Sequence, residues 1–200
     1  DTVCSSSAPF TLNNILPAGN VGKWSGQGVT GRDFNPGISA KTVQYEGPVK
    51  VKYEYTNPLT GCTSSDSQTL LIQSQPEINI LTPKPYQQCE GKVFTLNSDK
   101  KWAARTIWSG NGDGSFSTPD QLASDYTHGL NDTAMAGSAG RVTLTVSTVK
   151  EGVCPVAKDN IDLIIEPYPQ FNFLADPEIQ CEPAVINFFS SVSKPAGSSN

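Results

Sequence analysis

One set of motifs occurs twice in this chain and begins a third time, and this repetition constrains the fold more than any other feature. A cysteine followed by a Phe-Thr-Leu segment stands at Cys4 and again at Cys89. Each precedes a Trp-Ser-Gly-x-Gly motif by about 20 residues, at Trp24 and Trp108. A third start stands at Cys181. Because a repeat of this size is one folding unit, the pattern predicts tandem copies of one small domain.

A long stretch of each full repeat alternates apolar and polar residues, which is typical of a strand with one buried face. The apolar positions are Val49, Val51, Tyr53 and Tyr55 in the first repeat and Val142, Leu144 and Val146 in the second. A last strand is predicted at 69–72 and at 161–165, each after a polar turn that contains Asp66 or Asp159. No long segment has a helical period. The predicted fold class is therefore all-β, as tandem β-sandwiches.

Proline-bearing segments separate the repeats. One lies around Pro76, and the other contains Pro167 and Pro169. Such connections are short and stiff, so we expect neighbouring domains to be held apart. The predicted domains are residues 1–75, residues 76–166, and a truncated third repeat at 167–200 that has too little chain to bury its own core.

The five cysteines follow the repeat. Each full repeat has one cysteine at its first strand and one shortly before its last strand, so we predict the disulfides Cys4–Cys62 and Cys89–Cys154. Cys181 would then pair outside this fragment. The alternative is five free thiols in a cytosolic protein. Disulfides indicate an oxidising, extracytoplasmic compartment, and no C-x-x-C spacing supports a zinc ribbon or a thioredoxin-like motif.

Charge and motifs exclude several functions. The net charge is −5 and no Lys/Arg cluster follows a face, so the sequence gives no indication of nucleic-acid binding. No apolar run is long enough to insert into a membrane. The chain has no initiator Met and no signal peptide, which we interpret as a fragment of a longer protein. No nucleophile elbow, P-loop or H-E-x-x-H motif occurs, so we predict no catalytic residue, no cofactor and no enzyme.

A few residues are candidates for binding. Trp102 lacks a counterpart in the other repeat and is a candidate for an exposed contact, whereas Trp24 and Trp108 are predicted to be core residues. His128, the single histidine, is a second candidate contact, and its alternative is an ordinary loop residue. With one histidine and no acidic cluster, no metal site is predicted with a defined ligand set.

One weak metal candidate stands in the second repeat. Asn111, Asp113 and Ser115 alternate oxygen-bearing side chains with glycine, as calcium loops do, but the distal bidentate Glu of such loops is missing. A glycine turn after the tryptophan strand is the favoured interpretation. For Asp66 and Asp159, a side chain that holds a turn is favoured over a shared interdomain cation.

The pattern Cys…Phe-Thr-Leu…Trp-Ser-Gly-x-Gly…Tyr-x-Tyr-Thr…Gly-Cys…Asp-Ser-x-Thr resembles the immunoglobulin-like and PKD-like repeats of Bacteroidota cell-surface adhesins, including SprB-like gliding-motility adhesins. The second repeat departs from it at 144–147 and at Val153-Cys154. The resemblance implies export by the type IX secretion system and attachment at the outer membrane. Asp132-Thr133-Ala134 and Asp1-Thr2-Val3 resemble the short Asp-Thr-apolar O-glycosylation sequence of this phylum. The resemblance therefore implies a glycan at Thr133 and, with less support, at Thr2.

Three functions are compatible with these features. The first is a non-catalytic stalk of a secreted adhesin that serves adhesion or gliding motility as a monomeric repeat array. The second is a module that binds polysaccharide or protein through Trp102 or the loop at His128. The third is an accessory region of a secreted hydrolase. Expected partners are an extracellular surface, a polysaccharide, or proteins of the cell envelope and secretion machinery.

Overall fold

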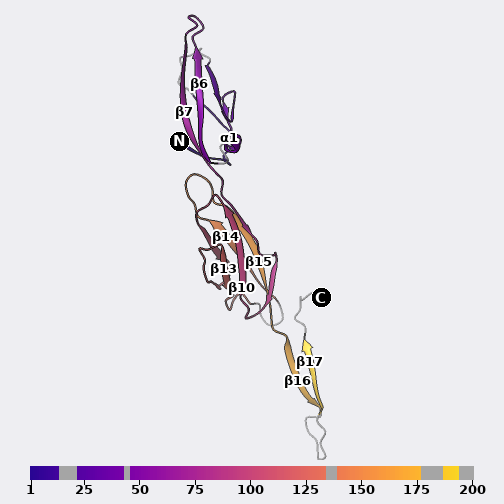
Figure 1. The fold of residues 1–200 in the computed structure, drawn as a ribbon. Helices are drawn as coiled ribbons and strands as arrows, with labels where there is room; N and C mark the ends of the chain where they lie inside the picture. The colour runs from indigo at the N-terminus through magenta and orange to yellow at the C-terminus, as the bar shows by residue number, and fades with distance from the viewer. Residues whose placement is uncertain (14–21, 43–45, 134–138, 177–186, 194–200) are drawn as a thin grey trace, which may run out of the picture. The chain divides into compact units, whose positions relative to one another are not determined.

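The computed structural model describes residues 1–13, 22–42, 46–133, 139–176 and 187–193. The chain is almost entirely β-structure (Figure 1). The strands are β1 (Thr2–Cys4), β2 (Phe10–Thr11), β3 (Gly22–Gly26), β4 (Val29–Thr30), β5 (Asp33–Phe34), β6 (Gly47–Thr56), β7 (Thr63–Gln73), β8 (Glu77–Ile80), β9 (Tyr86–Cys89), β10 (Phe94–Lys101), β11 (Thr106–Gly110), β12 (Ser115–Phe116), β13 (Ala123–Thr127), β14 (Gly140–Thr148), β15 (Lys158–Glu166), β16 (Gln170–Asp176) and β17 (Asn187–Ser193). The predicted fold class, all-β with tandem immunoglobulin-like sandwiches, is confirmed.

The chain forms two compact units. Unit 1 comprises Asp1–Ile78 together with two short segments, Lys100–Arg105 and Thr148–Ala157. Unit 2 comprises the remaining segments, from Asn79 onward. The segment Thr148–Ala157 connects β14 to β15 and belongs by sequence to the second repeat, yet it packs in unit 1. The predicted domain boundaries at 75 and 166 describe the sequence repeats and stay a prediction.

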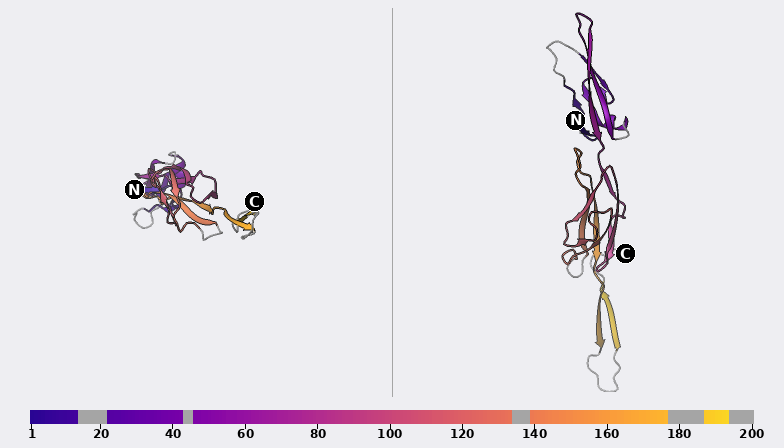
Figure 2. Two further views of the ribbon diagram at one scale, coloured as in Figure 1. Left: turned by 90° about the horizontal axis from the view of Figure 1, so that it is seen from below. Right: turned by 60° about the vertical axis from the view of Figure 1, so that its left-hand side comes forward.

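Unit 1 is built around a four-stranded sheet with the order β1-β7-β6-β3. Strands β6 and β7 form a long antiparallel hairpin, visible in Figures 1 and 2, and β1 pairs with β7 in parallel. The apolar face of β6 packs into the core at Val49 and Val51, which are buried as the alternation predicts, whereas Tyr53 and Tyr55 are only half-buried. The buried core consists of Leu12, Phe34, Ala40, Val49, Val51, Leu70 and Ile72.

A short helix in unit 1, α1 (Pro36–Thr42), was not expected from the sequence. Asn35 precedes it, and its Oδ1 accepts hydrogen bonds from the N–H groups of Gly37 and Ile38, at 3.0 and 3.3 Å. Asn at the cap and Pro at the first helical position are favourable start residues. A helix of two turns is too short to produce a recognisable period.

Unit 2 contains two four-stranded sheets, with the orders β12-β13-β10-β8 and β11-β14-β15-β9. Their facing sides form the core, and the alternation in β14 is regular, with every second residue buried. The largest buried side chains of this unit include Phe94, Leu96, Tyr126, Leu144 and Leu163. The second sheet repeats the strand order of unit 1 strand for strand, which is the structural form of the sequence repeat.

The described residues of the predicted third repeat form a hairpin. Strands β16 and β17 pair antiparallel, with Gln170 opposite Ser193 and Asp176 opposite Asn187. Cys181, for which we predict a partner outside this fragment, lies outside the described residues.

Candidate functional site at the disulfide of unit 1

A disulfide joins Cys4, the last residue of β1, to Cys154 in the β14–β15 connection. The two Cα atoms are 5.0 Å apart, and both residues are buried, at 3% and 1% exposure. Cys62 and Cys89 are exposed free thiols. The predicted pairs Cys4–Cys62 and Cys89–Cys154 are therefore wrong, although a disulfide within the described chain is present.

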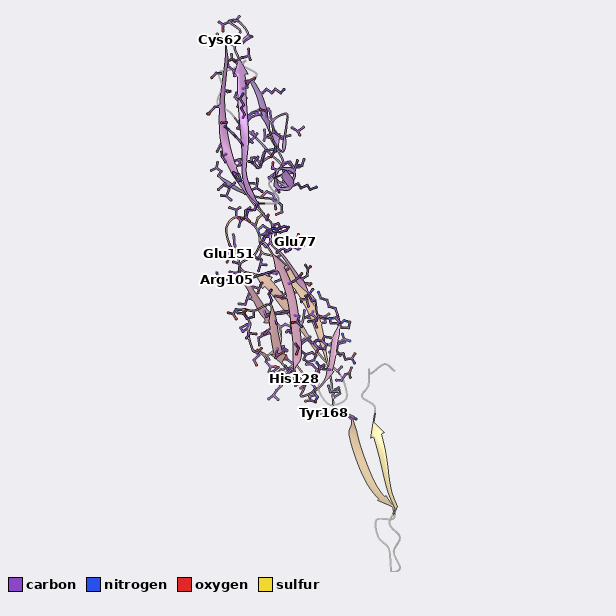
Figure 3. The ribbon with its side chains drawn as sticks, in the orientation of Figure 1. Cys62, Glu77, Arg105, His128, Glu151 and Tyr168 are labelled. Carbon is purple, nitrogen blue, oxygen red and sulfur yellow. A yellow bond between two sulfur atoms is a disulfide. The ribbon has the colours of Figure 1, made fainter. Side chains whose placement is uncertain are left out.

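The position of β1 along β7 explains the error. Strand β1 pairs in parallel with Leu71–Gln73, the last three residues of β7, so Cys4 lies opposite Gln73. Cys62 directly precedes Thr63, at the opposite end of this 11-residue strand. Eleven residues of strand span about 33 Å, whereas a disulfide needs Cα atoms within about 7 Å. Figure 3 shows Cys62 at the tip of the β6–β7 hairpin, at the other end of unit 1 from Glu151.

Polar side chains secure the connection around the disulfide. The amide of Gln73 donates to the carbonyl oxygen of Glu151 at 2.8 Å and accepts from the N–H of Val153 at 2.8 Å. The Nε2 of Gln75 donates to the carbonyl oxygen of Pro155 at 3.1 Å. Two glutamine side chains therefore satisfy backbone groups of the connection that would otherwise lack partners, in addition to the covalent bond.

Glycine is required within this connection. Gly152 has φ of 74°, and a Cβ there would lie 2.4 Å from the Oε1 of Gln73. Both the left-handed backbone and the close approach of Gln73 exclude a larger residue. Sequence reasoning missed Gln73, Gln75 and Gly152, and only the matching place of Gly61 before Cys62 in the first repeat gave a hint.

The segment that contains Trp102 lies in the same unit. Arg105 forms an ion pair with Glu151 at 3.4 Å, and Lys101 forms one with Glu77 at 3.7 Å, so charged residues flank Trp102 on both sides. Figure 3 shows Glu77, Arg105 and Glu151 close together. Trp102 is 40% exposed and has a positive φ of 52°, which is uncommon for an aromatic residue. Its predicted exposure fits this geometry.

The two repeated tryptophans differ in burial. Trp108 is a core residue, as predicted: it is 2% exposed, and its Nε1 donates to the carbonyl oxygen of Gln121 at 2.9 Å. Trp24 is only partly buried and packs against Tyr53, with ring centroids 4.9 Å apart. The Trp108 ring is therefore not available as a flat sugar-stacking platform.

The weak calcium candidate uses its oxygen atoms within the protein. The Oδ1 of Asn111 accepts from the N–H of Thr143 at 2.9 Å, and the Asp113 carboxylate accepts from both nitrogens of Asn131. Ser115 begins β12. Among the described residues, no group of three or more His, Cys, Asp or Glu side chains is placed to hold a metal ion. The geometry is that of a turn, which is the favoured interpretation.

A buried polar pair next to this turn escaped the sequence analysis. The hydroxyl of Tyr126 donates to Oδ2 of Asp132 at 2.6 Å, and this carboxylate also accepts from the N–H groups of Gly129 and Asp113. Burial opposes ionisation of Asp132, but these hydrogen bonds outweigh it and lower its pKa. Burial and the Asp132 carboxylate raise the pKa of Tyr126. The pair therefore joins the end of β13 to the loop that follows it.

The two candidate glycosylation residues lie in different settings. The Thr133 hydroxyl donates to the carbonyl oxygen of Leu130 at 2.9 Å, and Thr133 is half-buried. Thr2 is exposed on β1. Whether either threonine carries a sugar stays a prediction.

His128 supports a turn. Its Nε2 accepts from the N–H of Gly91 at 2.9 Å, so the ring nitrogen that could serve as a ligand or base is in use. His128 belongs to unit 2 and Trp102 to unit 1. The ordinary structural role, the alternative for this histidine, is the one that the geometry favours.

The repeated aspartates lie within strands rather than in turns. Asp159 in β15 accepts from the N–H of Ile80 at 2.7 Å and pairs with Lys84 at 2.7 Å. Burial opposes ionisation of Asp159, but the bonds from Ile80 and Lys84 lower its pKa overall. Asp66 is exposed on β7 and accepts from the N–H of Ser67 at 2.7 Å.

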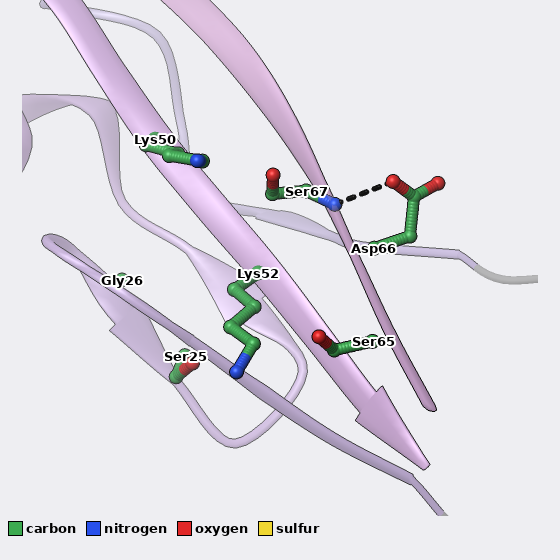
Figure 4. Close-up of a pocket in the computed structure, with 7 residues that line it drawn as sticks. All are labelled: Ser25, Gly26, Lys50, Lys52, Ser65, Asp66 and Ser67. Atoms are coloured by element: carbon green, nitrogen blue, oxygen red, sulfur yellow. Dashed lines mark hydrogen bonds between the residues drawn. The ribbon is translucent and has the colours of Figure 1, made fainter. Parts of the chain in front are cut away.

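Asp66 also borders a shallow pocket on the outer face of the unit 1 sheet (Figure 4). Lys50 and Lys52 project over it from β6, and serines line the rest. The ammonium of Lys52 pairs with Glu54 at 2.8 Å, and the Asp66 carboxylate points away from both lysines. The pocket has no aromatic or apolar floor, and its features are those of a solvated sheet face.

No protein-family model matches the sequence, and no curated protein matches it. Among solved structures, extracellular domains 3–5 of Drosophila OTK align with 83% of this chain and 59% of that chain, at 9% identity and a TM-score of 0.43. The four N-terminal immunoglobulin domains of Dscam1 isoform 9.44 align with 84% of this chain and 43% of that chain, at 10% identity and a TM-score of 0.38.

Fibronectin(III)-like modules of Clostridium thermocellum CbhA align with 84% of this chain and 90% of that chain, at 7% identity and a TM-score of 0.32. The chain spans less than two thirds of each of the first two structures. These are likenesses of fold alone. Among the described residues, no helix could cross a bilayer, because α1 has only seven residues.

Proposed function

We propose that this chain is a non-catalytic stalk segment of a secreted cell-surface adhesin, and that it transmits tension in adhesion or gliding. The observation that carries the proposal is the Cys4–Cys154 disulfide. It joins the first strand of one repeat to a connection of the next repeat, across a sequence separation of 150. Tension that enters at Cys4 passes through the sulfur atoms to Cys154, so the residues between them cannot be extended.

The disulfide also supports an extracytoplasmic location, because buried disulfides persist in oxidising compartments. In the chain-entropy model, a closed loop of this length stabilises the folded state by about 5 kcal/mol. The resemblance of the repeats to Bacteroidota surface adhesins supports export by the type IX system and attachment at the outer membrane. Ion pairs made by Lys101 and Arg105, on either side of Trp102 in the sequence, favour a stalk over a polysaccharide-binding module.

Surface digestion tests the location. Intact cells of the source organism would be treated with a protease that cannot cross the envelope. We expect peptides from this chain in the released fraction, with Cys4 linked to Cys154. Peptides that stay protected until the cells are lysed would overturn the extracellular placement.

A replacement experiment separates the stalk from a binding module. In the parent protein, residues 1–166 would be deleted, or replaced by an unrelated immunoglobulin tandem of equal length. For a stalk, we expect the deletion to weaken adhesion or gliding and the unrelated tandem to restore it. If only the native segment restores it, this segment binds a ligand and the stalk assignment fails.

A further inference from the structure

The exposed Cys89 has the same structural position as the disulfide-bonded Cys4. Strand β9 pairs in parallel with β15 and places Cys89 opposite Glu166, just as β1 places Cys4 opposite Gln73. After each cysteine, the next backbone N–H donates to the carbonyl oxygen of that opposite residue, at 2.8 Å in unit 1 and 2.7 Å in unit 2. The two cysteines are therefore equivalent in strand, register and backbone hydrogen bonding.

The exposed Cys62 is likewise equivalent to Cys154. Each lies in the connection between the two long strands of its repeat, β6–β7 or β14–β15. A glycine with left-handed backbone stands shortly before each, Gly61 with φ of 71° and Gly152 with φ of 74°. Among the described residues, one first-strand cysteine, Cys4, is bonded to one hairpin cysteine, Cys154. The other first-strand cysteine, Cys89, and the other hairpin cysteine, Cys62, are free.

We propose that Cys62 and Cys89 are the two halves of further links of the Cys4–Cys154 type. Cys89 bonds to the hairpin cysteine of a repeat that follows, and Cys62 bonds to the first-strand cysteine of a repeat that precedes. The partner on each side is another copy of this repeat. The inference rests on the proposed role as a repeat array and extends it, because every repeat would be covalently bonded to the next.

The bond forms by thiol–disulfide exchange. The Cys89 thiolate attacks a donor disulfide of an oxidant, such as oxidised glutathione or an oxidoreductase, and one donor thiol leaves. The hairpin thiolate then attacks this mixed disulfide, the second donor thiol leaves, and the protein S–S bond remains. The two protein thiols lose two electrons and two protons, and the donor disulfide is reduced to two thiols.

The residue opposite Cys89 indicates which hairpin fits there. Glu166 stands where Gln73 stands in unit 1, and its Oε1 accepts from Nε2 of Gln87 at 2.6 Å. In unit 1, Gln73 accepts from the N–H of Val153 and donates to the carbonyl oxygen of Glu151. The carboxylate of Glu166 can make the first kind of hydrogen bond, because it accepts, but not the second, because it has no donor. The hairpin that docks at Cys89 therefore presents donors, such as backbone N–H, Lys or Arg.

The surface beside Cys89 is suited to cover by another segment. Tyr168 is two residues beyond Glu166, as Gln75 is beyond Gln73, and it is 52% exposed. A Cβ added at Gly91 would lie 2.8 Å from the Tyr168 hydroxyl, so the two residues are in close contact. The N–H of Gly91 donates a hydrogen bond to Nε2 of His128. Figure 3 shows His128 and Tyr168 at the same end of unit 2.

Peptide mapping of the parent protein without reduction tests the pairing. After free thiols are blocked, we expect Cys89 linked to a hairpin-cysteine peptide from another repeat, and Cys62 linked to a first-strand peptide. A Cys89–Cys62 link between two chains would support the same rule, acting between copies. A Cys62–Cys89 link within one chain, or blocked free thiols at both positions, would overturn it.

Two variants of this chain test whether the two kinds of cysteine prefer each other. One carries Cys62→Ser and Cys181→Ser, the other Cys89→Ser and Cys181→Ser, so each keeps one free thiol beside the Cys4–Cys154 bond. When equal amounts of the two variants are mixed in a glutathione buffer, random exchange would make heterodimers about half of all dimers. We expect the ratio of heterodimers to homodimers to exceed the random value about tenfold, and to fall to it in urea. A random ratio without urea would overturn the inference.

These outcomes are separable from the proposed function. If Cys4–Cys154 is intact while Cys62 and Cys89 are free thiols, the stalk proposal stands and the continuous linkage fails. If Cys4–Cys154 is itself absent from the secreted protein, the observation that carries the stalk proposal fails.

Discussion

Stretching a single molecule between residues 1 and 200 measures the length that the Cys4–Cys154 bond protects. The separation of the two cysteines is 150 residues, and their Cα atoms are 5.0 Å apart. At about 3.5 Å for each extended residue, opening this bond releases roughly 500 Å of chain. With the bond intact, only roughly 50 residues outside the loop can extend, or less than about 180 Å.

The experiment compares an oxidised chain with the variant Cys4→Ser. Both would carry Cys62→Ser, Cys89→Ser and Cys181→Ser, so that no free thiol can attack the bond under load. We expect the contour length at full unfolding to increase by roughly 500 Å in the Cys4→Ser variant, and by the same amount when the oxidised chain is treated with a reductant.

A smaller gain would refute this reasoning. In a protein with Cys62 restored, a bond from Cys4 to Cys62 would protect only about 60 residues, so Cys4→Ser would release roughly 200 Å. An oxidised chain that already extends to its full contour length would mean that the bond does not form at all.

Three further predictions concern stability. Gly152→Ala and Gly61→Ala both impose a left-handed backbone on alanine, at about 1–2 kcal/mol, but only the first also meets Gln73, so chemical denaturation should show a larger loss for Gly152→Ala. Tyr126→Phe removes a buried hydrogen bond to Asp132, and we expect it to cost about 1–3 kcal/mol at neutral pH; equal stability of the variant would contradict the buried pair. The pKa of Asp132 is lowered in the folded state, so its ionised form stabilises the fold above the unfolded pKa of about 3.9. This stabilisation is lost as the pH falls through the folded pKa. The free energy of unfolding, measured from neutral to acid pH, should therefore decrease less steeply in Asp132→Asn.

The sequence predicted the strands well because alternation is a local property. Val49, Val51 and the apolar residues of β14 are buried as expected, and the repeated Trp108 is a core residue. The helix α1 was missed because its start, Asn-Pro-Gly, is equally typical of a turn.

The disulfide pairing could not be predicted from the same local pattern. It depends on which part of β7 the three residues of β1 pair with. Strand β1 pairs in parallel with Leu71–Gln73, at the carboxyl end of β7, and Cys62 precedes the other end of this strand, about 33 Å away. Pairing at the start of β7 would have brought β1 close to Cys62 and made the predicted bond feasible. The tertiary fold sets this position, and no local pattern in β1 encodes it.

The same parallel pairing determines what happens if a reductant opens the disulfide. The chain enters β1 at Thr2 and leaves β7 at Gln73, so opposite pulls at these two points slide the strands past each other lengthwise. The three residue pairs of this ladder are then loaded together in shear, rather than unzipped one after another. After reduction, this sheared ladder would still hold the first repeat, though more weakly than the disulfide does. The chain would therefore lengthen in two distinct steps.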